Sequence, residues 1–280
     1  MDNIKVISLD LDNTLLNASS RLSEKNRCAL EAASTKGIEL VINTGRGING
    51  IFEDVLSVKG LRYAITSNGA CIYDLQKNSR ILHYVLKPET VGKLLEIGTK
   101  FGATYEIFVE GKAYVSKKYY DNPTAFGMKE KLVPYIQGTR NPVADIEEFI
   151  SNHIGEIENF AYVLKDEKMH TDVYNSVVGD CEDMFVTSSD PWWIEVMDGS
   201  CGKGKGLKNL CDYLGYELNQ TCAFGDSGND LEMLEYAGVA VCMENGSDEC
   251  KKVADIIAPS NVLDGVATII YQEIINSHLF

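Results

Sequence analysis

The chain has 280 residues, with 41 acidic and 26 basic side chains, so its formal net charge is −15 and its pI is about 4.7. This charge argues against a nucleic-acid partner, because affinity for phosphate backbones comes from clustered Lys and Arg side chains, and it disfavours an anionic membrane surface likewise. With 45% apolar residues the chain can build one large or two modest cores, so we expect a folded protein rather than a disordered one.

The N-terminal segment predicts neither a signal peptide nor a membrane span, because Asp10 and Asp12 interrupt its apolar run. The eight cysteines include no C-x-x-C pair, and the four histidines show no metal-binding spacing. We therefore expect a cytoplasmic protein with reduced thiols, without a zinc site or a disulfide framework.

The first part of the chain has the pattern of buried strands alternating with helices. The β-branched run 4–9 predicts a strand buried on both faces, Ser23 is the expected N-cap of a helix over 24–36, and 38–42 predicts a second strand. Such a βαβ unit implies two parallel strands joined by a right-handed crossover.

This rhythm weakens after Gly45. We expect a helix over 48–56 and, further on, an inserted α/β lobe over 83–187, because five of the six prolines fall in or beside that segment and its aromatic residues are dense. The other elements expected in this part are strands 63–65 and 70–73, helix 88–101, and a hairpin of 105–109 with 113–116.

The strand and helix rhythm then returns. The expected strands are 192–197, 221–224, 239–241 and 256–257, and the expected helices are 207–214, 229–237 and 265–275. We therefore predict an α/β fold: a Rossmann-like, doubly wound parallel-sheet core formed by 1–82 and 188–280, interrupted by the inserted lobe 83–187.

Two carboxylates follow the first predicted strand. Asp10 and Asp12 are two residues apart, so in an extended segment they point to the same side, at the strand end where open α/β sheets bind ligands. Solvated loop carboxylates would give the same pattern. A calcium-binding EF-hand loop is set aside, because Leu15 and Arg21 occupy its glycine and glutamate positions.

A second acidic cluster follows another predicted strand, where Asp226 and Asp230 stand in the segment Gly225-Asp226-Ser227-Gly228-Asn229-Asp230. Helix capping is an equally open role for either residue. If both clusters converge, each carboxylate pair at roughly 4 Å repels by about 4 kcal/mol at an effective dielectric of 20. A hard divalent cation would relieve this repulsion, and oxygen-only ligands favour Mg²⁺.

Two further segments suit phosphate chemistry. Thr44, Gly45 and Arg46 follow the predicted strand 38–42 and offer a hydroxyl, free N–H groups and a guanidinium, although a plain turn fits equally well. Lys203 lies in a glycine-rich loop, where it could neutralise an anionic nucleophile or simply be solvated. A nucleotide-binding P-loop is disfavoured because Gly206 replaces the magnesium-binding Ser or Thr, and a dinucleotide fingerprint lacks its third glycine.

Taken in order, four segments of the chain resemble the four motifs of the haloacid dehalogenase superfamily. They are Asp10-Leu11-Asp12-Asn13-Thr14, Thr44-Gly45-Arg46, Lys203-Gly204 and Gly225-Asp226-Ser227-Gly228-Asn229-Asp230. The insertion resembles the α/β cap of the Cof-type subfamily IIB, whose members are mostly magnesium-dependent phosphatases of small phosphorylated metabolites. Segments 67–70, 252–255 and 261–266 also resemble flanking signatures of that subfamily.

The resemblance implies a role for each matching residue. Asp10 would be the nucleophile that forms an aspartyl-phosphate, Asp12 would protonate the leaving alcohol and then activate water, and Lys203 would balance charge. Mg²⁺ would be held by the carboxylates of Asp10 and Asp226 and the backbone carbonyl of Asp12, with Asp230 in support. The residues implied at the phosphate or substrate are Thr44, Gly45, Arg46, Asn68 and Asn229.

The family usually has glycine at position 13, where this chain has Asn13, a residue that tolerates the left-handed conformation. We expect a Mg²⁺-dependent phosphatase of small phosphorylated metabolites, sugar phosphates foremost, with a mobile cap that sets substrate specificity. The alternatives are a phosphomutase or phosphotransferase using the same aspartyl-phosphate, and a non-catalytic phosphometabolite-binding protein. A bound metal would invert the local sign of charge, which reconciles an acidic chain with an anionic substrate.

Overall fold

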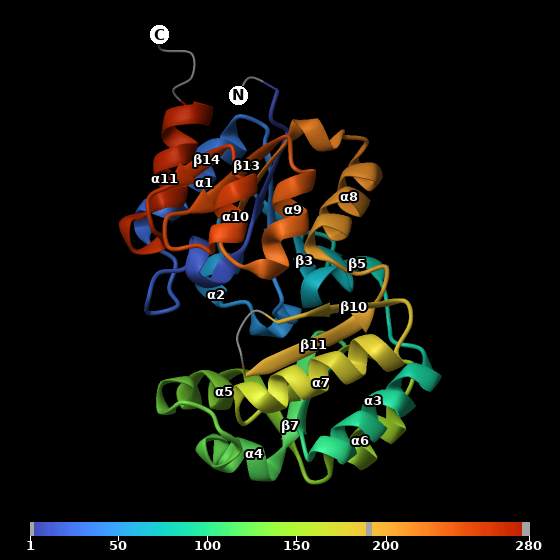
Figure 1. Ribbon diagram of the computed structural model, residues 1–280. Helices are drawn as coiled ribbons and strands as arrows, with labels where there is room; N and C mark the ends of the chain where they lie inside the picture. The colour runs from blue at the N-terminus through green and yellow to red at the C-terminus, as the bar shows by residue number, and fades with distance from the viewer. Residues whose placement is uncertain (1–2, 189–191, 276–280) are drawn as a thin grey trace. The chain divides into compact units, whose positions relative to one another are not determined.

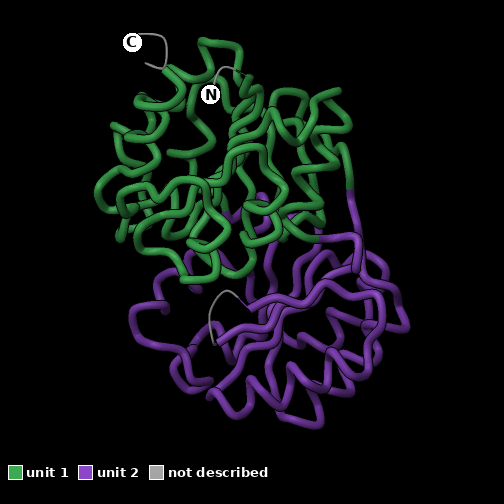
Figure 2. The backbone as a smooth tube through the Cα atoms, turned by 45° about the horizontal axis from the view of Figure 1, so that its top comes forward, with its two compact units in different colours: residues 1–45, 51–82, 202–280 green, residues 46–50, 83–201 purple. Residues whose placement is uncertain are grey.

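The computed structural model describes residues 3–188 and 192–275. These residues form two compact units, coloured separately in Figure 2. The first unit takes its described residues from 1–45, 51–82 and 202–280, and the second from 46–50 and 83–201. Among the described helices, none is long and apolar enough to cross a membrane.

The first unit is built on an eight-stranded sheet. Its strands are β1 (Val6–Leu9), β2 (Glu39–Asn43), β3 (Leu61–Thr66), β4 (Cys71–Asp74), β5 (Ser79–His83), β12 (Thr221–Gly225), β13 (Val239–Met243) and β14 (Ile256–Ala258). They are ordered β14-β13-β12-β1-β2-β3-β4-β5. From β14 to β3 each neighbouring pair is parallel, and β4 pairs antiparallel with β3.

Helices cover both faces of this sheet, as the upper part of Figure 1 shows. They are α1 (Glu24–Thr35), α2 (Glu53–Leu56), α8 (Lys203–Leu214), α9 (Leu231–Tyr236), α10 (Asp248–Val253) and α11 (Gly265–Ile269). Val6 of β1 packs in one cluster with Leu207 of α8 and Met233 of α9. The neighbouring Ile7 therefore points to the opposite face, the side of α1 and α11, which pack against each other. This doubly wound arrangement confirms the predicted fold class of the core.

The second unit is a six-stranded sheet with helices. Its strands are β6 (Thr104–Val109), β7 (Lys112–Ser116), β8 (Arg140–Val143), β9 (Ile157–Val163), β10 (Met184–Thr187) and β11 (Trp193–Asp198), ordered β10-β11-β9-β6-β7-β8. Its helices are α3 (Pro88–Phe101), α4 (Lys117–Asp121), α5 (Val133–Thr139), α6 (Ile146–Asn152) and α7 (Glu167–Asp180). A core of residues from α3, α6 and α7 packs on one face of the sheet.

Most predicted elements appear near their expected positions, and Ser23 caps α1 by accepting a hydrogen bond from the Asn26 N–H at 3.0 Å. The helix expected over 48–56 is wrong, because the chain forms a 3₁₀ turn at Ile48–Gly50 and a separate short α2. The helix expected to begin at residue 207 begins at Lys203. The strand β5 was not expected at all, because its sequence Ser-Arg-Ile-Leu-His is half-polar and partly exposed.

The second boundary of the inserted lobe also needs correction. The sequence pattern predicts this boundary between 187 and 188, which would assign the strand expected near Trp192 to the core. Instead, β11 pairs antiparallel with both β9 and β10, so the second unit extends to residue 201. Residues 46–50 also belong to the second unit. A strand pattern predicts an extended segment with a buried face, but it does not show which sheet that segment joins.

Candidate active site

The first predicted carboxylate pair is split by its local backbone. Asp10 follows β1 directly and is buried at 5% exposure, whereas Asp12 is exposed in the short turn η1 (Leu11–Leu15). This turn is not a regular helix, because Asp12 is extended and Asn13 has φ +61°. The left-handed conformation expected to be tolerable for Asn13 is therefore the one it adopts.

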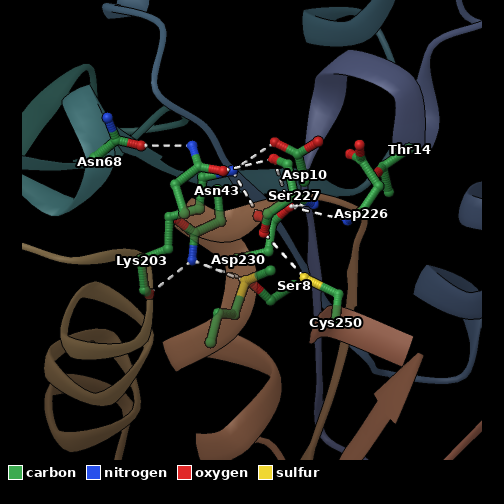
Figure 3. A network of polar contacts seen from close by, with 12 residues as sticks. Ser8, Asp10, Thr14, Asn43, Asn68, Lys203, Asp226, Ser227, Asp230 and Cys250 are labelled. Atoms are coloured by element: carbon green, nitrogen blue, oxygen red, sulfur yellow. Dashed lines mark hydrogen bonds and ion pairs between the residues drawn. The ribbon is translucent and has the colours of Figure 1, made fainter. Parts of the chain in front are cut away.

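Lys203 lies in the same buried place as Asp10. Its side chain is 1% exposed, and its Nζ donates to Asp10 Oδ1 and to Asp230 Oδ1, each at 2.6 Å (Figure 3). The lysine is not a solvated loop residue, because it opens α8. Gly206 lets α8 pack closely against β3, since a Cβ at this position would lie 2.6 Å from Ile65 Cγ2 of β3.

The segment after β12 brings in the second acidic cluster. Asp230 Oδ2 accepts hydrogen bonds from the backbone N–H groups of Asp226 and Ser227, at 2.9 and 3.0 Å. Asp230 therefore both caps this turn and, through Oδ1, pairs with Lys203. The side chain of Asp226 is held by the turn that follows β1, because Thr14 Oγ1 donates to Asp226 Oδ1 at 2.9 Å.

These groups make a buried cluster with an excess of negative charge. Asp10, Asp226 and Asp230 each offer a carboxylate oxygen, and these three oxygens lie within 4.8 Å of one another. Burial raises the pKa of Asp10 well above its usual range, although Lys203 opposes the shift. Burial and then the charge of Asp230 raise the pKa of Asp226 to about 6.

The charge of Lys203 is stabilised in the same place. Burial alone would lower the pKa of Lys203, but Asp10 and Asp230 raise it above its usual value. One ammonium thus faces three carboxylates, and an all-oxygen donor set with excess negative charge fits a hard divalent cation such as Mg²⁺. Of the four residues predicted at the metal, the exposed Asp12 side chain is not among these clustered carboxylates.

Four of the five residues predicted at the phosphate or substrate lie together in the first unit. Asn229 Nδ2 donates to Asn68 Oδ1 at 3.0 Å, and the Asn68 N–H donates to the Thr44 carbonyl at 3.1 Å. Gly45 lies against Asn68, since a Cβ at Gly45 would be 3.1 Å from Asn68 Oδ1. Asn68 itself has φ +49°. Polar backbone and side-chain groups are thereby concentrated beside the end of β2.

Arg46, the fifth of these residues, is assigned to the second unit. There its Nη1 donates to the Gly50 carbonyl at 2.8 Å and its guanidinium lies 5.2 Å from the centre of the Tyr135 ring.

Two residues of the network had no expected role. Thr14 holds Asp226, and Asn43 Nδ2 donates to the Lys203 carbonyl at 2.9 Å, which ties the start of α8 to the end of β2. Thr14 is part of the first quoted motif, and Asn43 directly precedes Thr44, so the positions were visible. Their partners lie 212 and 160 residues away, and only the folded chain shows them.

Comparison with known proteins shows the family of this chain. The family model for haloacid dehalogenase-like hydrolases matches residues 7–270. Phosphatase YwpJ of Bacillus subtilis (strain 168) is 31% identical, with 94% of this chain and 98% of the relative covered. The 5-amino-6-(5-phospho-D-ribitylamino)uracil phosphatase YcsE of the same organism is 28% identical over 94% of this chain and 93% of its own.

A solved structure supports the same conclusion. A haloacid dehalogenase-like hydrolase from B. subtilis matches with a TM-score of 0.83 and 26% identity, covering 97% of this chain and 100% of that one. The chain therefore belongs to the haloacid dehalogenase-like hydrolases, and it is a phosphatase of that family.

Proposed function

We propose that this phosphatase hydrolyses small phosphate monoesters, sugar phosphates foremost, in a Mg²⁺-dependent reaction through an aspartyl-phosphate on Asp10. The observation that carries the proposal is the buried contact of Lys203 with Asp10 and Asp230, beside Asp226. Asp10, Asp226 and Asp230 would hold the metal, with the backbone carbonyl of Asp12. When bound, Mg²⁺ supplies positive charge that lowers the repulsion between an anionic nucleophile and an anionic phosphate.

In the first step a carboxylate oxygen of Asp10 attacks phosphorus, and the bond from phosphorus to the substrate alcohol oxygen breaks. Asp12, in its protonated form, gives its proton to that leaving oxygen, so the products are a free alcohol and a phosphorylated Asp10. Lys203 keeps Asp10 oriented through the 2.6 Å contact. The exposed position of Asp12 supports this role, because an acid that serves the leaving group has to reach the substrate.

In the second step water attacks the phosphorus of the aspartyl-phosphate. Asp12, now ionised, takes a proton from that water, the bond from phosphorus to the Asp10 oxygen breaks, and inorganic phosphate leaves. Thr44, Gly45, Asn68 and Asn229 would bind the phosphoryl oxygens or the substrate throughout. The electron pair returns to the Asp10 carboxylate, so the enzyme ends in its starting form.

The proposed substrate class is supported by the name of a relative and by the place of the second unit in the chain. The relative YcsE is named for a phosphorylated ribitylamino compound, an open-chain sugar alcohol phosphate, which supports sugar-type monoesters. The second unit stands between the second and third motifs, so we assign substrate selection to it. Arg46 would act with that unit rather than with the phosphate-binding residues of the first.

The proposal is tested by phosphate release from a panel of phosphorylated metabolites with Mg²⁺ present. We expect turnover of sugar phosphates, its loss after thorough EDTA treatment, and its recovery when Mg²⁺ is added back in excess. Undiminished turnover after chelation would remove the metal from the mechanism. Labelled phosphate that moves to a second sugar without appearing as inorganic phosphate would favour the phosphomutase or phosphotransferase alternative.

A further inference from the structure

Three asparagines outside the four motifs bind the turn that carries Asp12. Asn245 Nδ2 donates to the Asn13 carbonyl at 2.8 Å, Asn26 Nδ2 to the Leu15 carbonyl at 3.1 Å, and Asn261 Nδ2 to the Leu16 carbonyl at 2.8 Å. The three come from different parts of the first unit: Asn26 from α1, Asn245 from the loop after β13, and Asn261 from the 3₁₀ turn Asn261–Leu263.

The oxygens of two of these side chains are used as well. Asn26 Oδ1 accepts from the Ala267 N–H at 3.0 Å, and Asn245 Oδ1 accepts from the Asn261 N–H at 3.0 Å. Each of these two carboxamides therefore bridges the catalytic turn to the segment between 261 and 267. Carboxamides suit this task because they carry a donor and an acceptor on one short side chain.

The turn needs such support because its own backbone is irregular. Asp12 has ψ +126° and Asn13 has φ +61°, so the backbone departs from helical dihedral angles at these two residues. The Leu16 N–H donates to the Leu11 carbonyl at 2.9 Å and closes the turn locally. The carbonyls of Asn13, Leu15 and Leu16 take their donors from the asparagines instead.

We infer that Asn26, Asn245 and Asn261 are positioning residues that hold the turn 11–16 so that Asp12 can deliver its proton to the leaving group. They act through Asp12 and do not touch the substrate. This inference rests on the acid role proposed for Asp12. A displacement of about 1 Å at a reacting group can cost roughly a hundredfold in rate, so three carbonyl contacts around one turn are enough to matter.

Asn245 is the residue to test, because it is exposed whereas Asn26 and Asn261 are buried at 1% and 7% exposure. Asn245→Ala removes both of its contacts. Asn245→Asp keeps Oδ1 as the acceptor for the Asn261 N–H but replaces the donor to the Asn13 carbonyl by a second carboxylate oxygen, which repels that carbonyl. Asn219→Ala, at an exposed position of the same unit, is the matched control.

The readout is kcat/KM for two probes that differ in the leaving group, β-glycerol phosphate and p-nitrophenyl phosphate. An alkoxide needs protonation as it leaves, whereas nitrophenolate does not, so a misplaced acid slows the first probe selectively. We expect Asn245→Ala and Asn245→Asp to lower kcat/KM for β-glycerol phosphate about tenfold more than for p-nitrophenyl phosphate. Asn219→Ala should leave both values unchanged.

A merely structural role predicts another result, because loss of folded protein lowers the apparent kcat/KM for both probes by the same factor. Equal losses, or no loss, in Asn245→Ala and Asn245→Asp would overturn the positioning role. Asp12→Asn separates this from the parent proposal: it should show the same selective loss, and in its background Asn245→Ala should add no further selectivity. Without selective loss in Asp12→Asn, the acid role of Asp12 fails and the inference with it.

Discussion

Each unit buries an ion pair, and the two pairs differ in balance. In the first unit Lys203 faces Asp10 and Asp230 with Asp226 nearby, so one positive charge meets three carboxylates. In the second unit Arg140 meets one carboxylate, with its Nε and Nη2 donating to Glu106 Oε2 at 3.0 and 2.8 Å. Tyr119 adds its hydroxyl to Glu106 Oε1 at 3.2 Å.

The difference separates a structural pair from a reactive one. Glu106 is 1% exposed and its charge is matched by one guanidinium, so the second pair is complete without a ligand. The first cluster retains excess negative charge in a buried place, where it costs most. This unbalanced, all-oxygen cluster could hold a cation, which is why we propose Mg²⁺ for the first unit and not for the second.

The largest effect is expected for Asp10→Asn. It removes the nucleophile, so phosphate release should fall by roughly 10³-fold or more. It also removes one negative charge from an overloaded cluster, so the thermal unfolding temperature should stay the same or rise. Phosphate-release assays and calorimetry check the two halves. Full activity in Asp10→Asn would refute the assigned nucleophile.

Lys203→Met should cost both stability and activity. It leaves the carboxylates of Asp10 and Asp230 buried without their shared partner, which typically destabilises a protein by about 3–5 kcal/mol. Lys208→Met is the matched control, because Lys208 forms an exposed pair with Asp212 in the same helix and solvent screens such a pair, so its loss should change stability little. Urea unfolding measures both variants, and similar losses in the two would mean that burial of Lys203 contributes little.

Arg140→Met tests the balanced pair. It leaves Glu106 buried alone, so we expect about 3–5 kcal/mol of destabilisation, most of which Glu106→Leu in the same chain should restore. In the first unit Asp10→Asn with Lys203→Met should recover only part of the lost stability, because Asp230 stays buried without Lys203, and it should leave the enzyme inactive. Urea unfolding with a p-nitrophenyl phosphate assay distinguishes these cases, and restored activity in the first-unit double variant would contradict the comparison.

The smallest effect is expected for a group outside both clusters. Burial raises the pKa of Tyr63 to about 12, against an ordinary value of 10.0. Between pH 10 and pH 12 the folded state keeps the Tyr63 phenol neutral, whereas the phenol of the unfolded chain ionises. The contribution of Tyr63 to the free energy of unfolding is therefore complete below pH 10 and is lost progressively as pH rises from 10 towards 12. Raising the pH from 9 to 11 should lower the free energy of unfolding of both proteins. The loss in Tyr63→Phe should be about 1 kcal/mol smaller than the loss in the parent chain. Equal losses in urea unfolding would contradict this.

Much of the fold could be predicted from local pattern. The helix at Pro88–Phe101 has its predicted bounds, and the alternation of buried strands with helices around β1 and β12 indicates a doubly wound sheet. The predictions that failed concern elements whose place in the fold depends on partners distant in the sequence. The strand β11 has an ordinary strand sequence, and only its pairing with β9 and β10 assigns it to the second unit.

The acidic clusters and Lys203 were also predictable, because short polar segments at strand ends are local features of the chain. Their roles in the network were not. Whether Lys203 is solvated or buried depends on the packing of α8 against β3, and whether Arg46 joins Thr44 depends on which unit its side chain packs in. Asn245 had no local signal at all, since it differs from other loop asparagines only by the carbonyl that it meets.

Residue order alone therefore determined the class of fold and the position of the acidic segments and Lys203 next to predicted strands, because these follow from side-chain type and short-range periodicity. Tertiary structure decided which carboxylates share Lys203, which unit holds Arg46 and β11, and how the turn bearing Asp12 is held. The physical reason is distance along the chain. Contacts such as Lys203 to Asp10 join residues 193 positions apart, and hydrogen bonds and ion pairs form only when folding has brought both partners within about 3 Å.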